Sequence, residues 1–420
     1  MKNSRELSIL LLQTILENKI FASEAKSKII PHDCPDQAFI NMLVQTSLRH
    51  LVYIRSIIKT FIRKKLPANA KEASYALILA TTEVLYLNTP DYAVINSYVE
   101  IIKKNLNKYI AGFINAILRK ICTEKERFRK EDCNAFFPQE FRRLLNLSYS
   151  KNTVSAIEQA SVKEPMLDIT VKKGVTIPDS QTLPLGSVRL SNNGNITLID
   201  GYSQGKWWVQ DFSSALPVKL IPELKNKKVL DLCSAPGGKT AQLISEGAKV
   251  TSVDVSPTRL QRLTENLTRL QLQPENIICA DAIKWLEDYE GEKFDIILLD
   301  APCSATGTLR RHPELVHIKN IKDVDTMTKI QKQMLNNIPS VLKTDGLLIY
   351  CTCSLSKQEG EQQISEFLHQ HPNFQTVLPH LPPELKSLQT TEGWIRILPS
   401  HLKDLGGADG FFIAILQKRD

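Results

Sequence analysis

Apolar residues recur at helical spacing through residues 1–145. In the first run they lie three or four positions apart, at Leu7, Leu10, Leu11, Ile15 and Leu16. The same spacing returns between Ile40 and Val52, and Pro67 and Pro90 separate such runs. Positions three and four apart share one face of an α-helix, so the pattern predicts amphipathic helices around a common core. We therefore expect residues 1–145 to form an all-α domain.

The pattern changes between residues 146 and 215. Leu167, Ile169 and Val171 alternate with polar residues, and glycine, proline and asparagine residues typical of turns follow. A period of two is typical of a strand with one buried face. The segment 146–215 is therefore predicted to be a small α+β subdomain that links two larger domains.

Between residues 216 and 420, short apolar runs alternate with helical patterns. The runs that we interpret as strands are Lys227–Leu232, Lys249–Val253, Ile277–Cys279, Phe294–Leu299, Leu347–Cys351 and Phe411–Leu416. Helices are expected at Thr240–Glu246 and after Ser256 and Pro257, which suit an N-cap and a first helical position. Such alternation predicts a doubly wound α/β domain with a mostly parallel sheet, in which ligands bind at the carboxyl ends of the strands.

The positive charge is concentrated in the first third of the chain. The whole chain carries a net charge of +8, residues 1–150 carry +9, and the remainder carries −1. A basic domain joined to a near-neutral one favours a polyanionic partner, most simply a nucleic acid. A solubilising surface charge is the alternative that charge alone leaves open.

Cysteine usage and hydropathy bound the setting of the protein. The eight cysteines form no Cys-x-x-Cys pair, which argues against a disulfide scaffold and a zinc site and favours a reduced, cytoplasmic location. No apolar run approaches the roughly 20 residues needed to cross a bilayer. The N-terminus lacks the apolar core of a signal peptide. We expect no metal and no membrane partner.

The first chemical motif is the turn after the strand Lys227–Leu232. It contains two glycines, a proline and a lysine in Cys233-Ser234-Ala235-Pro236-Gly237-Gly238-Lys239. A glycine-rich turn lets a ligand approach the amide groups at a helix N-terminus. Cys233 stands where a P-loop needs glycine, so ATP or GTP binding is disfavoured. A tight turn with no ligand is the alternative.

Two acidic residues follow the next strands of the predicted sheet. Asp254 comes about 20 residues after the glycine turn, where a carboxylate can accept hydrogen bonds from ribose hydroxyls. Asp281 follows the strand after that and is placed to reach an adenine edge. Taken alone, Asp254 is equally a helix cap and Asp281 a surface carboxylate.

Two further strands end in cysteine-containing motifs. Asp300-Ala301-Pro302-Cys303 follows Phe294–Leu299, and Cys353 follows Leu347–Cys351. A lone cysteine is usually a small buried hydrophobe, but two at the ligand-binding edge favour chemistry, and Lys239 could promote a thiolate. Methylation of carbon 5 of cytosine needs a thiolate to add to carbon 6, a proton acceptor and an acid. Cys353, Cys303 and Asp300 are candidates for these roles, and the loop Arg310-Arg311-His312 is a candidate for phosphate binding or a solvated loop.

These motifs together resemble the RNA 5-methylcytosine methyltransferases, which include the bacterial Sun/Fmu proteins and their eukaryotic nucleolar relatives. The resemblance rests on Asp231–Thr240, on Asp300–Glu314 and on Tyr350–Ser354. In addition, Gly112–Arg119 is similar to the end of a helical RNA-binding domain like the antitermination factor NusB. The resemblance implies a Rossmann-like class I methyltransferase domain, S-adenosylmethionine as cofactor, and 5-methylcytosine formation in 16S ribosomal RNA.

Carried over by position, the resemblance also implies the site residues. The cofactor would be bound by Cys233, Ser234, Ala235, Pro236, Gly237, Gly238, Lys239, Asp254, Asp281 and Asp300. Cys353 would be the nucleophile, Cys303 would assist proton removal, and Asp300 and Lys239 would complete the catalytic group. Ser256 and the Val316-His317 pair depart from the usual family residues, which weakens the ribose and substrate assignments around them.

Several alternatives remain open at this level. A Pro-Cys nucleophile, as in DNA cytosine methyltransferases, would favour Cys303, whereas the Thr-Cys motif favours Cys353. The substrate could be another RNA, or the chain could be a non-catalytic RNA-binding or antitermination factor. We expect 16S ribosomal RNA as the partner, no DNA, and a monomer.

Overall fold

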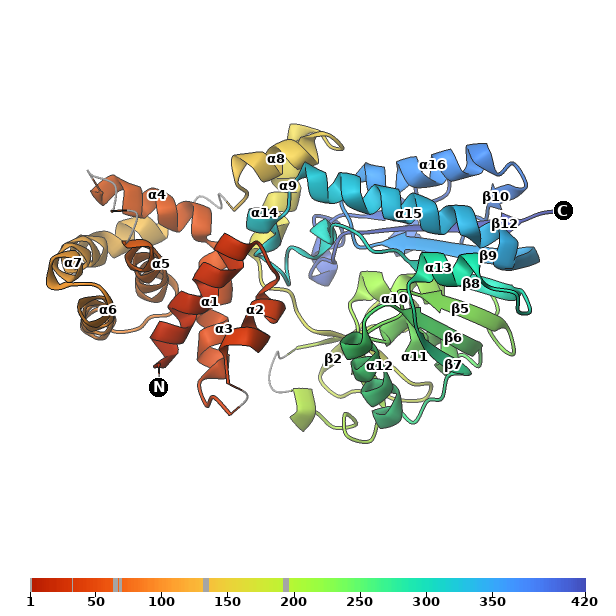
Figure 1. The fold of residues 1–420 in the computed structure, drawn as a ribbon, viewed down its shortest axis with the longest axis horizontal. Coiled ribbons are helices and arrows are strands. Elements are labelled where there is room, and N and C mark those ends of the chain that lie inside the picture. Colours follow the sequence, from red (N-terminus) through yellow and green to blue (C-terminus); the bar gives the residue numbers. More distant parts are fainter. Residues whose placement is uncertain (1, 32, 63–66, 68–69, 131–135, 192–195) are drawn as a thin grey trace. The chain divides into compact units, whose positions relative to one another are not determined.

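The computed structural model describes residues 2–31, 33–62, 67, 70–130, 136–191 and 196–420 (Figure 1). Its contacts divide the chain into two compact units. Met1–Lys163 and Leu309–Asn320 make up the first, which we call the helical unit. Glu164–Thr308 and Ile321–Asp420 make up the second, the sheet unit.

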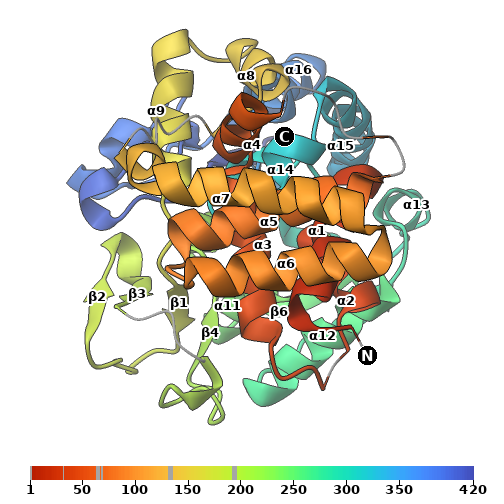
Figure 2. The ribbon, with the colours of Figure 1, turned by 90° about the vertical axis from the view of Figure 1, so that its left-hand side faces the viewer.

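The helical unit is built around one buried helix. Its elements are α1 (Ser4–Asn18), α2 (Ala22–Ile29), α3 (Gln37–Arg49), α4 (Leu51–Phe61), α5 (Lys71–Tyr86), α6 (Asp91–Asn105), α7 (Lys108–Lys130), α8 (Gln139–Asn146) and α9 (Lys151–Val162). Helix α5 contacts α1, α3, α4, α6 and α7, and Figure 2 shows α5, α6 and α7 running side by side. Most of α5, from Ala76 to Leu85, is buried because it is covered on several sides. The predicted all-α N-terminal domain is confirmed.

A segment from the C-terminal half of the chain completes the helical unit. It contains α14 (Leu315–Ile318), and the buried carboxylate of Glu314 accepts a hydrogen bond from the N–H of Ala22 at the start of α2 (3.0 Å). Arg49 donates to the carbonyl of Arg310 (2.8 Å), and a ring nitrogen of His317 lies 2.9 Å from the carbonyl of Leu48. Residues 309–320 therefore pack with α1–α3 although they lie within the range 216–420 that the sequence pattern assigned to the α/β domain.

The sheet unit begins with a small antiparallel sheet in the order β2-β3-β1-β4. Its strands are β1 (Asp168–Val171), β2 (Ser180–Thr182), β3 (Val188–Leu190) and β4 (Trp207–Val209). Arg189 and Asp168 form a buried ion pair between β3 and β1 (2.6 Å), and Asp168 also accepts from the N–H of Phe212 (3.1 Å). This carboxylate thus fixes the small sheet to the helix that follows it, α10 (Phe212–Lys219).

The large sheet has the order β10-β12-β9-β8-β5-β6-β7, with β11 (Ile395–Ile397) paired to β12. Its other strands are β5 (Lys228–Leu232), β6 (Lys249–Asp254), β7 (Asn276–Cys279), β8 (Phe294–Asp300), β9 (Leu342–Thr352), β10 (Phe374–Thr376) and β12 (Phe411–Lys418). Strands β5 to β9 are parallel to one another, whereas β12 is antiparallel to β9. The mostly parallel α/β sheet expected from the sequence is confirmed.

Alternate residues of the central strands feed two cores, one on each face of the sheet. Ile296 and Leu298 of β8 pack with α10 and α11 (Gly238–Ser245), whereas Ile297 and Leu299 pack on the other face. That other face is covered by α13 (Ala282–Glu287), α15 (Ile321–Val341) and α16 (Glu361–Gln370). Helix α12 (Pro257–Arg269) packs with Trp208 in a smaller cluster. Burial on both faces explains why these strands are continuous apolar runs.

Candidate functional site

The glycine turn lies between β5 and α11, as the sequence predicts. Gly237 has φ +99°, and a Cβ built there would lie 2.9 Å from Cγ of Leu263. Both the left-handed backbone and this close approach exclude a larger residue without rearrangement. The turn therefore brings bare backbone to the N-terminus of α11, where amide groups favour a polar or anionic ligand group.

Buried carboxylates hold the turn in place from two strands. Asp254, at the end of β6, accepts from the N–H of Ala235 (3.1 Å) and of Ser256 (3.0 Å). Asp231 in β5 accepts from the hydroxyl of Thr240 in α11 (2.6 Å). Burial raises the pKa of Asp231 to about 7, although the hydrogen bond from Thr240 opposes the rise. Asp231 belongs to the motif Asp231–Thr240, but nothing in the sequence pattern marked its hydrogen bond to Thr240.

Lys239 and Asp300 form a charged pair at the same edge of the sheet. Nζ of Lys239 lies 2.7 Å from Oδ2 of Asp300 and 3.1 Å from the hydroxyl of Ser214. Burial alone would lower the pKa of Lys239, but the Asp300 carboxylate outweighs burial and holds that pKa above its ordinary value. The ammonium group thus stays charged and is paired with a carboxylate.

The two cysteines that the sequence singled out lie in contact. Sγ of Cys303 is 3.4 Å from Sγ of Cys353. Their strands are parallel neighbours, with Asp300 of β8 paired to Cys351 of β9, so the loops that follow leave the sheet together. The structure thereby brings Cys303 and Cys353 to the edge that carries the Lys239–Asp300 pair.

The thiols of this edge differ in their environment. The hydrogen bond with Cys353 and burial hold the pKa of Cys303 well above its ordinary value. Burial and the nearby Asp300 do the same to Cys351, whose Sγ lies 3.4 Å from Oδ1 of Asp300. Burial raises the pKa of Cys233 in the glycine turn to about 12. Cys351 had been interpreted only as the end of a strand, and nothing in its spacing marks its contact with Asp300.

Asp281 and Arg310, two further positions that the sequence singled out, differ in exposure. Asp281 is exposed at the end of β7 and caps α13 by accepting from the N–H groups of Ile283 (3.0 Å) and Lys284 (3.2 Å). Arg310 is only 3% exposed, so the interpretation of Arg310-Arg311-His312 as one exposed basic loop is wrong for its first residue. Three consecutive basic residues give no sign in the sequence of which one the loop buries.

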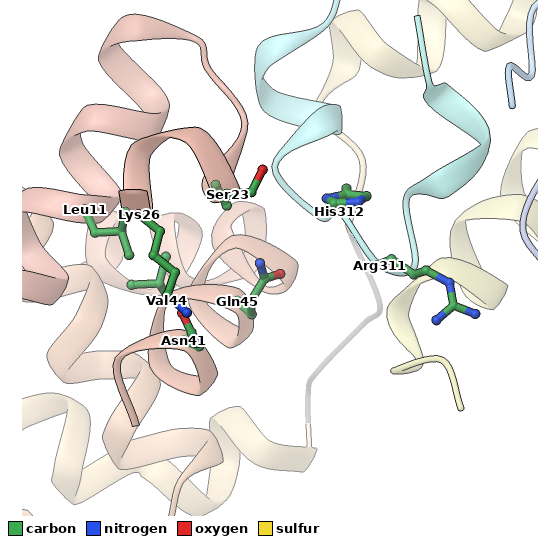
Figure 3. Close-up of a pocket in the computed structure, with 9 residues that line it drawn as sticks. Leu11, Ser23, Lys26, Asn41, Val44, Gln45, Arg311 and His312 are labelled. Carbon is green, nitrogen blue, oxygen red and sulfur yellow. The ribbon is translucent and has the colours of Figure 1, made fainter. Parts of the chain in front are cut away.

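Arg311 and His312, in contrast, line a pocket within the helical unit (Figure 3). The pocket has a volume of about 190 Å³ and is also lined by Lys26 of α2 and by Asn41 and Gln45 of α3. Figure 3 shows these α2 and α3 side chains on one side of the pocket and the loop with His312 on the other. The lining therefore combines these cationic and hydrogen-bonding residues with the apolar residues Leu11, Ala22 and Val44.

Neither a metal-binding cluster nor a membrane-spanning helix is found among the described residues. No group of three or more His, Cys, Asp and Glu side chains there is arranged to hold a metal ion. None of the helices in the described ranges combines the length and apolar character needed to cross a membrane.

Comparison with known proteins matches both parts of the chain. A family model described as 16S rRNA methyltransferase RsmB/F matches residues 218–417, and one described as NusB family matches residues 2–123. Ribosomal RNA small subunit methyltransferase B of Proteus mirabilis (strain HI4320) is 30% identical, covering 91% of each chain. Probable ribosomal RNA small subunit methyltransferase B of Bacillus subtilis (strain 168) is 29% identical, covering 99% of this chain and 98% of the relative. The solved structure of PH0851 shares the fold, with a TM-score of 0.75 at 22% identity over 100% of this chain and 99% of its own.

The glycine turn fits the cofactor of this family. Gly237 leaves the backbone open to a ligand, and the contact with Ala235 keeps the Asp254 carboxylate beside the turn. Because the likeness to the curated relatives runs through nearly the full length of the chain, the protein belongs to the RsmB/F family of S-adenosylmethionine-dependent ribosomal RNA methyltransferases.

Proposed function

We propose that the protein methylates carbon 5 of a cytosine in 16S ribosomal RNA through a covalent bond between Cys353 and carbon 6 of the base. The observation that carries this proposal is the contact of 3.4 Å between the sulfurs of Cys303 and Cys353. One thiol serves as nucleophile and leaving group, and the second is in reach of the same ring. Few other reactions require two free thiols side by side next to a methyl-donor site.

The proposed reaction uses the two sulfurs in sequence. The thiolate of Cys353 adds to carbon 6, which turns carbon 5 into a nucleophilic enamine carbon. S-adenosylmethionine, when bound, supplies the methyl group that carbon 5 takes. Cys303, as a thiolate that has lost its own proton to solvent, then removes the proton from carbon 5, the double bond between carbons 5 and 6 re-forms, and Cys353 leaves as a thiolate.

The contact between the sulfurs bears on this division of roles. The hydrogen bond with Cys353 and burial hold the pKa of Cys303 well above its ordinary value, and either sulfur can be the donor of the pair. Once Cys353 is bonded to carbon 6, this cause of the raised pKa is removed. Cys303 can then lose its own proton to solvent and accept the proton of carbon 5 as a thiolate.

We assign supporting roles to the residues of the glycine turn and the neighbouring carboxylates. The turn from Cys233 to Lys239, with Asp254, Asp281 and Asp300, would bind S-adenosylmethionine. The charged pair of Lys239 and Asp300, at 2.7 Å, would form hydrogen bonds with the ring nitrogen of the target base or with the cofactor. Asp281 would bind S-adenosylmethionine from an exposed position at the end of β7.

We further propose that residues 1–145 form an RNA-binding domain, that residues 146–215 link it to the methyltransferase domain of residues 216–420, and that the protein acts as a cytoplasmic monomer. Support comes from the charge of +9 on residues 1–150 and from the pocket lined by Lys26, Arg311 and His312. Cationic and amide side chains suit contacts with phosphate and base edges of RNA. DNA is not expected as a substrate.

Bisulfite sequencing of RNA from a deletion strain and from the complemented strain tests the substrate. We expect one cytosine of 16S ribosomal RNA to lose its methyl group on deletion and to regain it on complementation. Loss at a transfer RNA or large-subunit position instead would contradict the proposed substrate. Unchanged methylation of all RNA would favour a non-catalytic RNA-binding or antitermination factor.

A further inference from the structure

Glu359 is a buried carboxylate beside the two cysteine loops that no motif singled out. It ends a short 3₁₀-helix, Lys357–Glu359, six residues after Cys353, and its exposed fraction is 0%. Its own backbone carbonyl accepts from the hydroxyl of Tyr350 in β9 (2.8 Å). The residue is thus held from both its main chain and its side chain.

The carboxylate joins the loop after β8 to the loop after β9. Oε1 accepts from the N–H of Ser304 (2.8 Å), and Oε2 accepts from the hydroxyls of Ser304 (2.5 Å) and Ser354 (2.5 Å). Ser304 directly follows Cys303, and Ser354 directly follows Cys353. One carboxylate therefore bridges the two residues that are covalently next to the two sulfurs.

A third element strengthens this bridge. Nε2 of Gln331 in α15 lies 3.2 Å from Oε1 of Glu359 and 2.9 Å from the carbonyl of Pro302. The four groups that donate to the Glu359 carboxylate are the N–H and hydroxyl of Ser304, the hydroxyl of Ser354 and the amide of Gln331, and all are uncharged. Burial raises the pKa of Glu359, while the hydrogen bonds from the serines oppose the rise. Burying a carboxylate without a cation is costly unless its oxygens are well supplied with hydrogen bonds. The arrangement therefore depends on both serines staying in place.

We propose that Glu359 is a positioning residue that holds Cys303 and Cys353 at the separation required for proton removal and release of the RNA adduct. Its hydrogen bonds go to Ser304 and Ser354, so it positions the two sulfurs through these serines, while its charge also helps to hold the pKa of Cys303 above the ordinary value. The inference rests on the covalent mechanism proposed above. It differs from cofactor binding, because the glycine turn and Asp254 make no hydrogen bond to this bridge.

The test compares Glu359→Ala with Glu359→Gln in single-turnover and steady-state methylation of 16S ribosomal RNA. Alanine removes the bridge, and since a misplacement of 1 Å costs roughly 100-fold, kcat should fall by that order. The RNA–protein adduct should accumulate on denaturing gels, while KM for S-adenosylmethionine stays within roughly twofold. Glutamine keeps one acceptor and can donate to the serine hydroxyls, which reverse their roles, so kcat should recover to within roughly threefold of the wild type.

Three further variants keep the result interpretable. Glu158→Ala removes another buried glutamate, which accepts from the N–H groups of Phe136 and Phe137 in the helical unit, and it should not cause adduct to accumulate. If Glu359→Ala does not fold, the double variant Ser304→Ala/Ser354→Ala removes both hydroxyl donors and should give the same adduct accumulation. Cys353→Ala, run in parallel, establishes whether any adduct depends on that sulfur.

The outcomes separate the two proposals. If the wild type forms no adduct with RNA, the covalent mechanism itself fails, and the role of Glu359 falls with it. If the wild type forms adduct but Glu359→Ala turns over like the wild type, the positioning role alone is overturned. Equal loss of activity in the alanine and glutamine variants, with weakened cofactor binding, would also overturn it by showing a general structural effect.

Discussion

At the scale of single residues, the proposed mechanism depends on the different environments of chemically identical thiols. Cys303 and Cys353 face each other at the end of two strands, whereas Cys351 is fully buried against Asp300. Burial and neighbouring negative charge raise a thiol pKa, because both disfavour the thiolate. When two thiols are in contact, one can be ionised while the other stays protonated. In the proposed reaction, Cys353 is the thiolate at the first step, and Cys303 becomes the proton acceptor after Cys353 has bonded to the base.

Substitution of the two cysteines should therefore have opposite effects on the covalent adduct. Cys353→Ala should lower methylation by roughly 1,000-fold or more and abolish the adduct, since no nucleophile remains. Cys303→Ala should also stop turnover but leave the adduct trapped on denaturing gels with labelled 16S ribosomal RNA. Cys279→Ala, at the exposed end of β7, is the control and should behave like the wild type. The reverse pattern would exchange the two roles.

Asp231 gives a pH dependence of stability that can be tested. Its pKa is about 7 in the folded protein against about 3.8 for the free group, so the folded state binds the proton more tightly. Stability from this group is therefore greatest below about pH 4, falls as the pH rises to about 7, and levels off above it. Asp231→Asn does not lose stability in this way, because asparagine does not ionise. Its free energy of unfolding should exceed that of the wild type above pH 7, by on the order of 1–3 kcal/mol, and be similar near pH 4.

Thermal unfolding of both proteins at several pH values checks this prediction. The quantity to compare is the difference in free energy of unfolding between the variant and the wild type at each pH, because other groups titrate equally in both. A difference that is the same at pH 4 and pH 8 would show that the carboxyl group of Asp231 does not titrate in this range.

At the scale of elements, the glycine turn shows how local sequence shapes the proposed cofactor site. Gly237 precedes α11 and Gly247 follows it, and both have positive φ values, of 99° and 86°. The two differ in their neighbours: a Cβ at 237 would lie 2.9 Å from Cγ of Leu263, whereas one at 247 would lie 3.6 Å from Lys225. The same substitution at the two ends of one helix therefore separates backbone strain from damage to the turn.

Gly237→Ala should weaken S-adenosylmethionine binding by roughly tenfold or more, because the turn must shift away from Leu263. Gly247→Ala should reduce stability by about 1 kcal/mol through its positive φ without changing cofactor affinity. Calorimetric titration gives the affinities, and thermal unfolding gives the stabilities. Equal loss of affinity in the two variants would mean that the turn is not the cofactor site.

At the scale of the whole molecule, the charge is divided between the two units. The excess of positive charge lies in residues 1–150, and the helical unit also includes the loop that carries Arg311 and His312. Phosphate contacts dominate the affinity for RNA and make it depend on salt. This loop begins only a few residues after Cys303. The proposed RNA-binding residues Arg311 and His312 are therefore close in sequence to the proposed catalytic cysteine.

Lys26→Glu should therefore weaken binding of 16S ribosomal RNA by roughly five- to tenfold and reduce the slope of log affinity against log salt by about one. Lys103→Glu is the matched control, because Lys103 is an exposed lysine of α6 that is paired with Glu100. It should have a smaller effect on affinity. Filter binding at several salt concentrations measures both quantities, and equal effects of the two variants would exclude a specific role for the pocket.

Much of the fold follows from periodicity, but some elements do not. The strands β5, β6, β8 and β12 lie where the sequence pattern predicts them, and in β8 burial on both faces explains the continuous apolar run Ile296–Leu299. Strand β9 begins at Leu342, five residues before the predicted start, and its first part carries polar residues that give no strand signal. Helix α15 had no prediction, because its buried positions, such as Val324 and Gln331, include polar residues.

The sequence by itself determined the order of domains, the glycine turn and the two cysteine motifs, because each rests on local chemistry or on a short-range pattern. Only the tertiary structure decided that the two sulfurs lie in contact, that Lys239 pairs with Asp300, and that Glu359 bridges two serines. It also decided that residues 309–320 pack with the helical unit and that Arg310 is buried. These contacts are made between residues that lie between 5 and about 300 positions apart in the chain. Hydrophobic periodicity reports only on residues within one helix or strand, so it cannot predict such contacts.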